Sequence, residues 1–177
     1  MIIQDKSQKI KDKKRYKAGF TLIEMLVVMA VIGILASIIM FQLYRAKESA
    51  RLVKARGDVN QIRKALTLLE NDANEWSGHN PVDQVGSGAS GNEVWDLSAP
   101  SAGLIATDGN YNNWSGPYIS AIVNDPWGHD YFFDPDYDID PGVGERWAAV
   151  VGSFGPDGIG QNTYGGDDII EPIIVRQ

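Results

Sequence analysis

Residues 17–24, Lys-Ala-Gly-Phe-Thr-Leu-Ile-Glu, lead directly into the uncharged run MLVVMAVIGILASIIMF at positions 25–41. With the apolar residues that flank it, this stretch reaches about 20 residues, which is enough to cross about 30 Å of hydrocarbon as a helix. A carboxylate is costly to desolvate at the start of such a run, so we expect Glu24 to have a function. The stretch predicts a retained membrane helix or a signal anchor.

Charge divides the 177-residue chain into three zones. Residues 1–19 carry seven Lys and Arg against two Asp, whereas the chain from residue 66 onward carries 18 Asp and Glu against two Arg. The basic head predicts a cytoplasmic N-terminus, although five bases between residues 45 and 56 weaken that prediction. The acidic remainder disfavours a nucleic acid as a direct partner, and the absence of cysteine excludes a disulfide scaffold.

The helix is expected to continue beyond the membrane segment. Apolar residues recur three and four positions apart on one face: Leu52, Ala55, Val59, Ile62, Leu66, Leu69 and Ala73. Gly78 and Pro81 provide a stop signal, so we predict one helix from Phe20 to about Trp76. The alternative is a hinge at Gly57 between a membrane helix and a separate soluble helix.

The remainder predicts a loop followed by a small antiparallel sheet. Residues 77–115 are rich in Gly, Ser, Asn and Asp, which is typical of a flexible surface loop; their GxGxxG pattern lacks the βαβ context of a dinucleotide site. Strands are predicted at 118–123, 131–134 and 147–152, with a weaker fourth at 169–175 because it contains Pro172. A long helix against three or four strands makes the fold class α+β.

The junction at residues 17–24 resembles the class III signal of type IV pilins and of type II secretion pseudopilins. The resemblance implies that a membrane peptidase cuts between Gly19 and Phe20, that Phe20 is then N-methylated, and that the apolar helix is retained. It also implies that Glu24 meets the amino group of Phe20 on a neighbouring subunit during assembly. The alternative is a chance match in front of a plain signal anchor.

Two further segments resemble one branch of that superfamily, the major pseudopilins (the G subunit). They are GPYI at 116–119 with DPWGHDY at 125–131, and GSFGPDG at 152–158 with GGDDI at 165–169. The resemblance implies a pilin-like fold with a C-terminal calcium loop. The expected organisation is a cleaved leader (1–19), a transmembrane and polymerisation half of the helix (20–44), an amphipathic half (45–76), a variable loop (77–115), and a sheet with the calcium loop (116–177).

The residues of the C-terminal loop support a cation site by themselves. Asp157, Asp167 and Asp168 lie among glycines, which permit tight reversals that bring distant carboxylates together. Oxygen ligands without His or Cys favour a hard ion, and an irregular loop favours Ca²⁺ over Mg²⁺. Ser153 could add a hydroxyl oxygen. The alternative is a solvated acidic turn without a metal.

A second acidic run, Asp134-Pro-Asp-Tyr-Asp-Ile-Asp140, partly follows the spacing of an EF-hand loop, with Glu145 in the twelfth position. Ile139 occupies the position that needs glycine, and Pro135 intrudes. We therefore predict a hairpin loop with an exposed acidic face, and a weak second cation site is the alternative.

These expectations describe a structural subunit without enzymatic activity. It would be a single-pass inner-membrane protein with a cytoplasmic N-terminus and a periplasmic C-terminal domain, and would then enter a periplasmic pseudopilus. Its expected partners are further copies of itself, minor pseudopilins, the prepilin peptidase, and the inner-membrane assembly platform with its ATPase. The alternatives are a type IV pilin for adhesion, twitching or DNA uptake, an anchored calcium-binding adhesin, and a membrane-anchored enzyme. The enzyme is disfavoured because two histidines and no G-x-S-x-G element offer little for catalysis.

Overall fold

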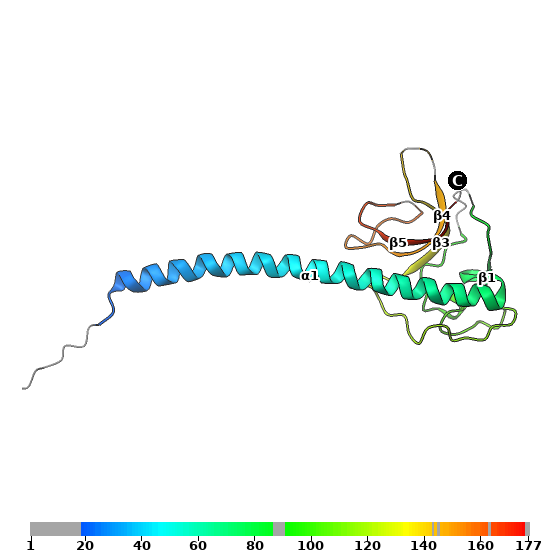
Figure 1. Ribbon diagram of the computed structural model, residues 1–177, viewed down its shortest axis with the longest axis horizontal. Coiled ribbons are helices and arrows are strands. Elements are labelled where there is room, and N and C mark those ends of the chain that lie inside the picture. The colour runs from blue at the N-terminus through cyan, green and yellow to red at the C-terminus, as the bar shows by residue number, and fades with distance from the viewer. Residues whose placement is uncertain (1–18, 87–90, 143, 145, 163, 176–177) are drawn as a thin grey trace, which may run out of the picture. The chain divides into compact units, whose positions relative to one another are not determined.

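The computed structural model describes residues 19–86, 91–142, 144, 146–162 and 164–175. Its longest element is the α-helix α1, Leu22–Ala73, which appears in Figure 1 from blue at its start to green at its end. Two compact units divide the chain at Tyr44 and Arg45, and α1 contributes to both. The helix is continuous through Gly57, so the alternative of a hinge there is wrong. The predicted leader lies outside the described residues except for Gly19.

Helix α1 begins with a reciprocal cap. The backbone N–H and the hydroxyl of Thr21 both donate to Glu24 Oε2 at 2.7 Å, and the Thr21 hydroxyl accepts the Glu24 N–H at 3.3 Å. This is a capping box, which satisfies N–H groups that have no partner within the helix. The sequence Thr-Leu-Ile-Glu therefore sets the start of the helix two residues later than we predicted.

Helix α1 also ends earlier than predicted. Asn74 adopts a left-handed conformation with φ of 56°, and its N–H donates to the Glu70 carbonyl at 2.8 Å. Asparagine tolerates this conformation and terminates helices in the same way as glycine. The chain then reverses through strands β1 (Glu75–Trp76) and β2 (Asn80–Pro81), which flank a 3₁₀ turn, Ser77–His79. Gly78 lies inside this reversal and does not itself stop the helix.

The second half of α1 packs through the predicted stripe. Its buried residues are Ala55, Val59, Ile62, Ala65, Leu66, Leu69 and Ala73. Six of the seven predicted stripe positions are among them, and the exception is Leu52, which remains 36% exposed. The helical period therefore identified the face of α1 that meets the rest of the fold.

Three strands form the main sheet: β3 (Phe132–Asp138), β4 (Trp147–Ser153) and β5 (Ile169–Val175). They are antiparallel in the order β3-β4-β5 (Figure 1). Residues on alternate faces join two different clusters, since Phe133 and Val151 pack with the α1 stripe while Phe132 and Val150 face the other side. The sheet thus carries one core beneath α1 and a smaller aromatic cluster on its outer face.

Both prolines of the sheet coincide with irregular pairing. The register between β3 and β4 shifts between Asp134 and Tyr137, so Pro135 and Asp136 lie opposite Ala149. The register between β4 and β5 shifts where Pro172 pairs with Val150. Proline cannot donate to a ladder and is tolerated at bulges and edges. The fourth predicted strand is confirmed over 169–175 because its proline lies on the edge strand beside such a shift.

Two predictions for this region are wrong. Residues 118–123 form no strand; the Tyr118 N–H donates to the Leu104 carbonyl at 2.9 Å, and Ile119 and Ile122 pack against the main core as irregular chain. The acidic run does not form an exposed hairpin loop, because Asp134 and Asp136 lie within β3 and are fully or almost fully buried. Hydrophobic alternation cannot predict a strand that buries carboxylates.

The segment 77–115 is more ordered than a surface loop. It contains β2 and a second 3₁₀ turn, Pro100–Ala102, and Val94 forms an isolated bridge with Phe133 at the edge of β3. Its buried side chains include Leu97, Leu104 and Tyr111. The apolar residues that recur within this polar segment are the sequence signal that the segment contributes to the core.

Candidate functional site

The processing junction lies in irregular chain before α1. Gly19 and Phe20 are exposed, and the space around a Cβ at Gly19 is open. An extended, accessible backbone is what a peptidase needs in order to bind a peptide on either side of the bond that it cuts. The carboxylate of Glu24 is engaged with Thr21 in the helix cap, so within one chain Glu24 has a structural role of its own.

The first half of α1 exposes an apolar surface. The large exposed residues are Phe20, Leu22, Ile23, Met25, Leu26, Val27, Val28, Met29, Val31, Ile32, Ile34, Leu35, Ile38, Ile39, Met40, Phe41, Leu43 and Tyr44. By length and composition, α1 is the one described helix that could cross a membrane. A contiguous apolar surface of this size is unfavourable in water. It therefore needs hydrocarbon or other apolar helices around it.

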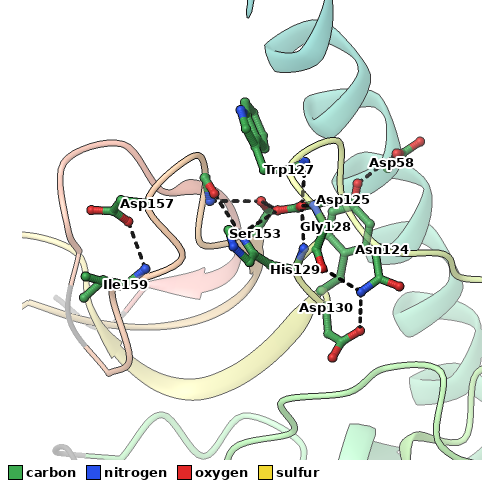
Figure 2. Close-up of polar contacts among 12 residues, drawn as sticks. Asp58, Asn124, Asp125, Trp127, Gly128, His129, Asp130, Ser153, Asp157 and Ile159 are labelled. Carbon is green, nitrogen blue, oxygen red and sulfur yellow. Dashed lines mark hydrogen bonds and ion pairs between the residues drawn. The ribbon is translucent and has the colours of Figure 1, made fainter.

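The DPWG turn at residues 125–128 is organised by one carboxylate. Asp125 is 5% exposed, and its Oδ1 accepts the N–H groups of Trp127, Gly128 and His129 at 2.8–2.9 Å. Its Oδ2 accepts the hydroxyl of Ser153 at 2.5 Å. Figure 2 shows these bonds converging on Asp125 from the turn and from the end of β4. Asp125 therefore joins the turn to the start of the C-terminal loop.

The same segment connects α1 to that loop. On the helix side, Trp127 Nε1 donates to Glu48 Oε2 at 3.3 Å, and the Tyr131 hydroxyl donates to Asp58 Oδ2 at 2.8 Å. On the loop side, His129 Nδ1 lies 3.0 Å from the Gly155 carbonyl oxygen. Residues 125–131 thus contact both the helix and the segment that carries the predicted metal ligands (Figure 2).

The pKa of Tyr131 reflects this connection. Burial raises its pKa above the ordinary value, and the adjacent Asp58 carboxylate raises it further. The phenol therefore stays protonated and remains a donor to Asp58 throughout the range in which proteins fold. An aspartate followed directly by proline and, three residues on, by glycine is a turn signal, and this signal could have identified the role of Asp125 from the sequence.

The four predicted metal ligands occupy different environments. Asp168 is 6% exposed, and its Oδ2 accepts the Tyr137 hydroxyl at 2.7 Å and the Gly165 N–H at 2.5 Å. Asp157 is exposed and accepts the Ile159 N–H, as Figure 2 shows. Asp167 lies with its backbone against Gly155. The Ser153 hydroxyl donates to Asp125 and accepts the Gly155 N–H at 3.1 Å, so it supports the turn and does not point into the loop as a free ligand.

The loop has features that fit a cation. Asp168 Oδ1 is buried and has no hydrogen-bond partner. Burial raises the pKa of Asp168, and the charges of Asp167 and Asp157 raise it further while bonds from Tyr137 and Gly165 oppose the shift. Three carboxylates thus repel one another around one unsatisfied oxygen. Within the described ranges, however, no three Asp, Glu or His side chains already stand together as a metal site.

A second polar cluster lies in the compact unit formed by residues 45–177, called the soluble unit below, and the sequence interpretation missed it. His79 Nδ1 lies 2.9 Å from Glu75 Oε2, and His79 Nε2 lies 3.0 Å from Asp108 Oδ2. The imidazole stacks on Tyr111 with ring centroids 4.0 Å apart. Burial opposes protonation of His79, but the hydrogen bonds and charges of Asp108 and Glu75 prevail and raise its pKa. These contacts link the chain at the end of α1 to residues 108–111.

Comparison with known proteins agrees with the fold and the junction. Residues 14–40 match the prokaryotic N-terminal methylation motif, and residues 100–171 match the family described as type II secretion system protein G. Type II secretion system core protein G of Escherichia coli K12 is 35% identical over 147 residues, which cover 83% of this chain and 85% of the relative. The protein of the same name from Klebsiella pneumoniae is 33% identical over 151 residues, covering 85% of this chain and 91% of the relative.

A third relative, core protein G of Vibrio cholerae serotype O1, is 31% identical over 149 residues, with 82% of this chain and 85% of the relative covered. The two family matches fall on the junction with the first half of α1 and on the second compact unit. These matches favour a secretion pseudopilin over the type IV pilin alternative and over an enzyme. The chain belongs to the family of type II secretion system core protein G, whose members are structural subunits.

Proposed function

We propose that this protein polymerises through the first half of α1 into a periplasmic pseudopilus that helps to move folded proteins across the outer membrane. The observation that carries this proposal is the apolar surface of residues 20–44, which nothing in the chain covers within the described residues. In the membrane, lipid would cover it; in a filament, the same helices of other subunits would do so. One surface can therefore serve both states of the subunit.

The chain is proposed to insert once into the inner membrane, with its basic head in the cytoplasm and residues from about 45 onward in the periplasm. The seven bases of the head support this orientation. Cleavage between Gly19 and Phe20 by the prepilin peptidase would remove the head, and methylation would follow on Phe20. Removal of the head would free α1 to leave the bilayer without carrying a cluster of charges through it.

The proposed cofactor is one Ca²⁺ held by Asp157, Asp167 and Asp168. The unsatisfied Asp168 Oδ1 supports it, because a buried acceptor without a donor is costly. A hard divalent ion would supply the missing partner and relieve the repulsion among the three carboxylates. Without cysteine, such an ion would be the means of fixing the loop between β4 and β5.

The proposed partners follow from assembly. Other copies of the chain would pack against α1, minor pseudopilins would join the same filament, and an inner-membrane platform with a cytoplasmic ATPase would extract the subunits. The two roles of Glu24 can be separated in this setting. Its helix cap needs only an acceptor and is available to glutamine, whereas a pair with the amino group of Phe20 on a neighbour needs the charge.

A pair of variants tests the proposal in cells that contain the secretion machinery. Glu24→Gln should be inserted and cleaved, with mature protein beginning at Phe20, but should yield at least about tenfold less filament, the effect of about 1.4 kcal/mol per subunit contact. Thr21→Val, which removes the cap hydroxyl and keeps the charge, is the matched control and should assemble. Normal filament yield from Glu24→Gln, or mature protein that begins at Met1, would contradict the proposal.

A further inference from the structure

Two buried carboxylates lie in β3, away from the predicted calcium loop in sequence. Asp134 is fully buried and Asp136 is 1% exposed. Asp134 pairs with Val150 and follows Phe132 by two positions, so it lies on the face of the sheet that carries the smaller aromatic cluster. A charged group in this position is surrounded by apolar side chains.

Glu93 approaches Asp134 from the neighbouring chain segment. Val94 and Phe133 form an antiparallel bridge and exchange N–H···O bonds of 2.8 and 2.9 Å. The next pair outward is Glu93 opposite Asp134, whose side chains share one face at a Cβ separation of about 5 Å. The Glu93 charge accordingly acts on Asp134. Two carboxylates of distant sequence origin therefore face the same space.

One oxygen of Asp134 and one oxygen of Glu93 lack donors. Asp134 Oδ1 accepts the Asp136 N–H at 2.9 Å, but Asp134 Oδ2 is buried without a partner. Glu93 Oε2 accepts the Gly91 N–H at 2.7 Å, but Glu93 Oε1 is likewise buried without a partner. None of the ion pairs formed by the described residues includes either side chain.

Two other buried acids of the same unit have donors for their carboxylate oxygens. Asp125 receives four hydrogen bonds, from three backbone N–H groups and one hydroxyl. Asp138, at the end of β3, accepts the N–H groups of Asp140 and Arg146 at 3.1 and 3.2 Å. The fold thus supplies donors to Asp125 and Asp138, whereas Asp134 and Glu93, like Asp168 in the C-terminal loop, each keep one unsatisfied oxygen.

The group needs a partner that can satisfy more than one oxygen. A proton shared between Asp134 and Asp136 would leave Glu93 Oε1 without a donor. A divalent cation would satisfy the open oxygens of Asp134 and Glu93 together, with the neighbouring Asp136 carboxylate as a third ligand.

We propose that Glu93, Asp134 and Asp136 form a second divalent-cation site, selective for Ca²⁺ and separate from the loop at residues 157–168. All ligands are oxygens, and Ca²⁺ tolerates irregular arrangements of them better than Mg²⁺ does. No three carboxylates of the described chain already stand at ligand distances, so the ion would draw the long Glu93 side chain toward Asp134. Bound there, it would fix the segment around Glu93 to the edge of β3.

The close approach of Gly86 fits this arrangement. A Cβ at Gly86 would lie 2.7 Å from Asp136 Oδ2, so only glycine lets the backbone lie against that carboxylate. The segment before Glu93 therefore also reaches the acidic group, which brings backbone oxygens near it. Carbonyl oxygens and water commonly complete the six to eight ligands of Ca²⁺.

The test is calcium titration of the full-length protein in detergent after removal of metals with a chelator. Wild type should bind two Ca²⁺ per chain. Glu93→Gln and Asp134→Asn keep the side-chain shapes and should each weaken one of the two sites at least tenfold, while Asp168→Asn should abolish the other. Asp130→Asn, which alters an exposed carboxylate bonded only to the Asn124 amide, is the matched control and should bind as wild type does.

The outcomes separate the two sites. If wild type binds one ion that Asp134→Asn removes and Asp168→Asn keeps, the second site stands and the proposal for the C-terminal loop fails. If Glu93→Gln binds Ca²⁺ with wild-type stoichiometry and affinity, the second site is overturned and a shared proton neutralises Asp134. Should Asp134→Asn fail to fold by circular dichroism, Glu93→Gln decides alone, because Glu93 is only partly buried.

Discussion

Asp125 shows how one carboxylate can organise a turn. It accepts four hydrogen bonds while almost fully buried, and three of the four donors would lose their acceptor if the carboxylate were removed; the Gly128 N–H also lies 3.0 Å from the Asp125 carbonyl oxygen. A buried donor left unsatisfied costs about 1–3 kcal/mol. Asp125 therefore stabilises the connection among the DPWG turn, the end of β4 and, through Trp127, helix α1.

We predict that Asp125→Ala lowers the free energy of unfolding by about 3–5 kcal/mol, since one buried hydroxyl and two partly buried N–H groups lose their acceptor together. Ser153→Ala removes only one of the four bonds and should cost about 1–3 kcal/mol. Asp130→Ala, five residues away in an exposed position, should cost less than about 0.5 kcal/mol. Urea unfolding of the three variants measures the order, and equal losses from Asp125→Ala and Asp130→Ala would contradict the assigned role.

His79 predicts a pH dependence of stability. Burial opposes protonation, but the carboxylates of Asp108 and Glu75 outweigh it by accepting hydrogen bonds from the imidazole and by their charges, so the pKa of His79 is raised above 6.5. A histidine whose pKa is raised on folding stabilises the fold fully below pH 6.5, and that contribution is lost as the pH rises through the folded-state pKa. The melting temperature of wild type should therefore fall across this window.

The matched variant for this prediction is His79→Gln, which keeps a hydrogen-bonding side chain without the charge. Its melting temperature should change less than that of wild type between pH 6 and pH 8. Asp108→Asn should reduce the same slope by removing one of the two carboxylates that raise the pKa. A wild-type slope that persists in both variants would show that another group titrates in this range.

Among the elements, α1 places a buried residue directly beside an exposed one in its second half. Leu69 is fully buried in the core stripe, whereas the adjacent Leu68 is 51% exposed. We predict that Leu69→Ala lowers the free energy of unfolding by about 2–5 kcal/mol, because it loses buried apolar area and leaves a cavity. Leu68→Ala should change it by less than about 0.5 kcal/mol. Chemical denaturation compares the two, and similar losses would mean that the stripe is assigned to the wrong face.

The elements also show what the sequence could predict. Helix α1 and its buried stripe followed from periodicity, and β4 and β5 followed from apolar runs. The end of α1 did not, because Asn74 adopts a left-handed conformation that residue type permits but does not require. Strand β3 was only partly predicted, because its buried carboxylates at 134 and 136 obscure the apolar pattern.

The candidate sites differ in how far the sequence reveals them. The junction is a local motif, so the sequence alone predicts Gly19, Phe20 and Glu24, and the N-terminal methylation motif matches across these positions. The proposed ligands of the C-terminal loop depend on how the chain reverses between β4 and β5. The sequence therefore suggested Ser153 as a ligand, although its hydroxyl is held by Asp125. Glu75 lies only four positions before His79, but Asp108 lies 29 positions after it, and no short spacing reveals that second contact.

At the scale of the whole molecule, the chain combines a unit that requires an apolar environment with a unit that folds around its own core. The second unit is strongly acidic and has no disulfide, so its C-terminal loop relies on local contacts. Hydrogen bonds to Asp168 and Asp125 fix both ends of that loop, while Asp157 at its exposed part has only a turn contact. Calcium bound there would therefore stabilise the unit as a whole by preventing the loop from opening.

We predict that a chelator lowers the melting temperature of the soluble unit in full-length protein, and that added Ca²⁺ restores it. At a free Ca²⁺ concentration about 100 times the Kd, binding to the folded state contributes about 2.7 kcal/mol, which corresponds to a shift on the order of 5–10 °C. Asp168→Ala should lose the part of this response that comes from the C-terminal loop and should keep the part that comes from the site proposed at Glu93, Asp134 and Asp136. Glu171→Ala, a change in β5 outside the ligand set, should retain the wild-type response. Differential scanning calorimetry in detergent provides the measurement. If the melting temperature of wild type does not depend on Ca²⁺, calcium does not stabilise the unit. The hydrogen bonds of Asp125 and Asp168 would then hold the loop alone.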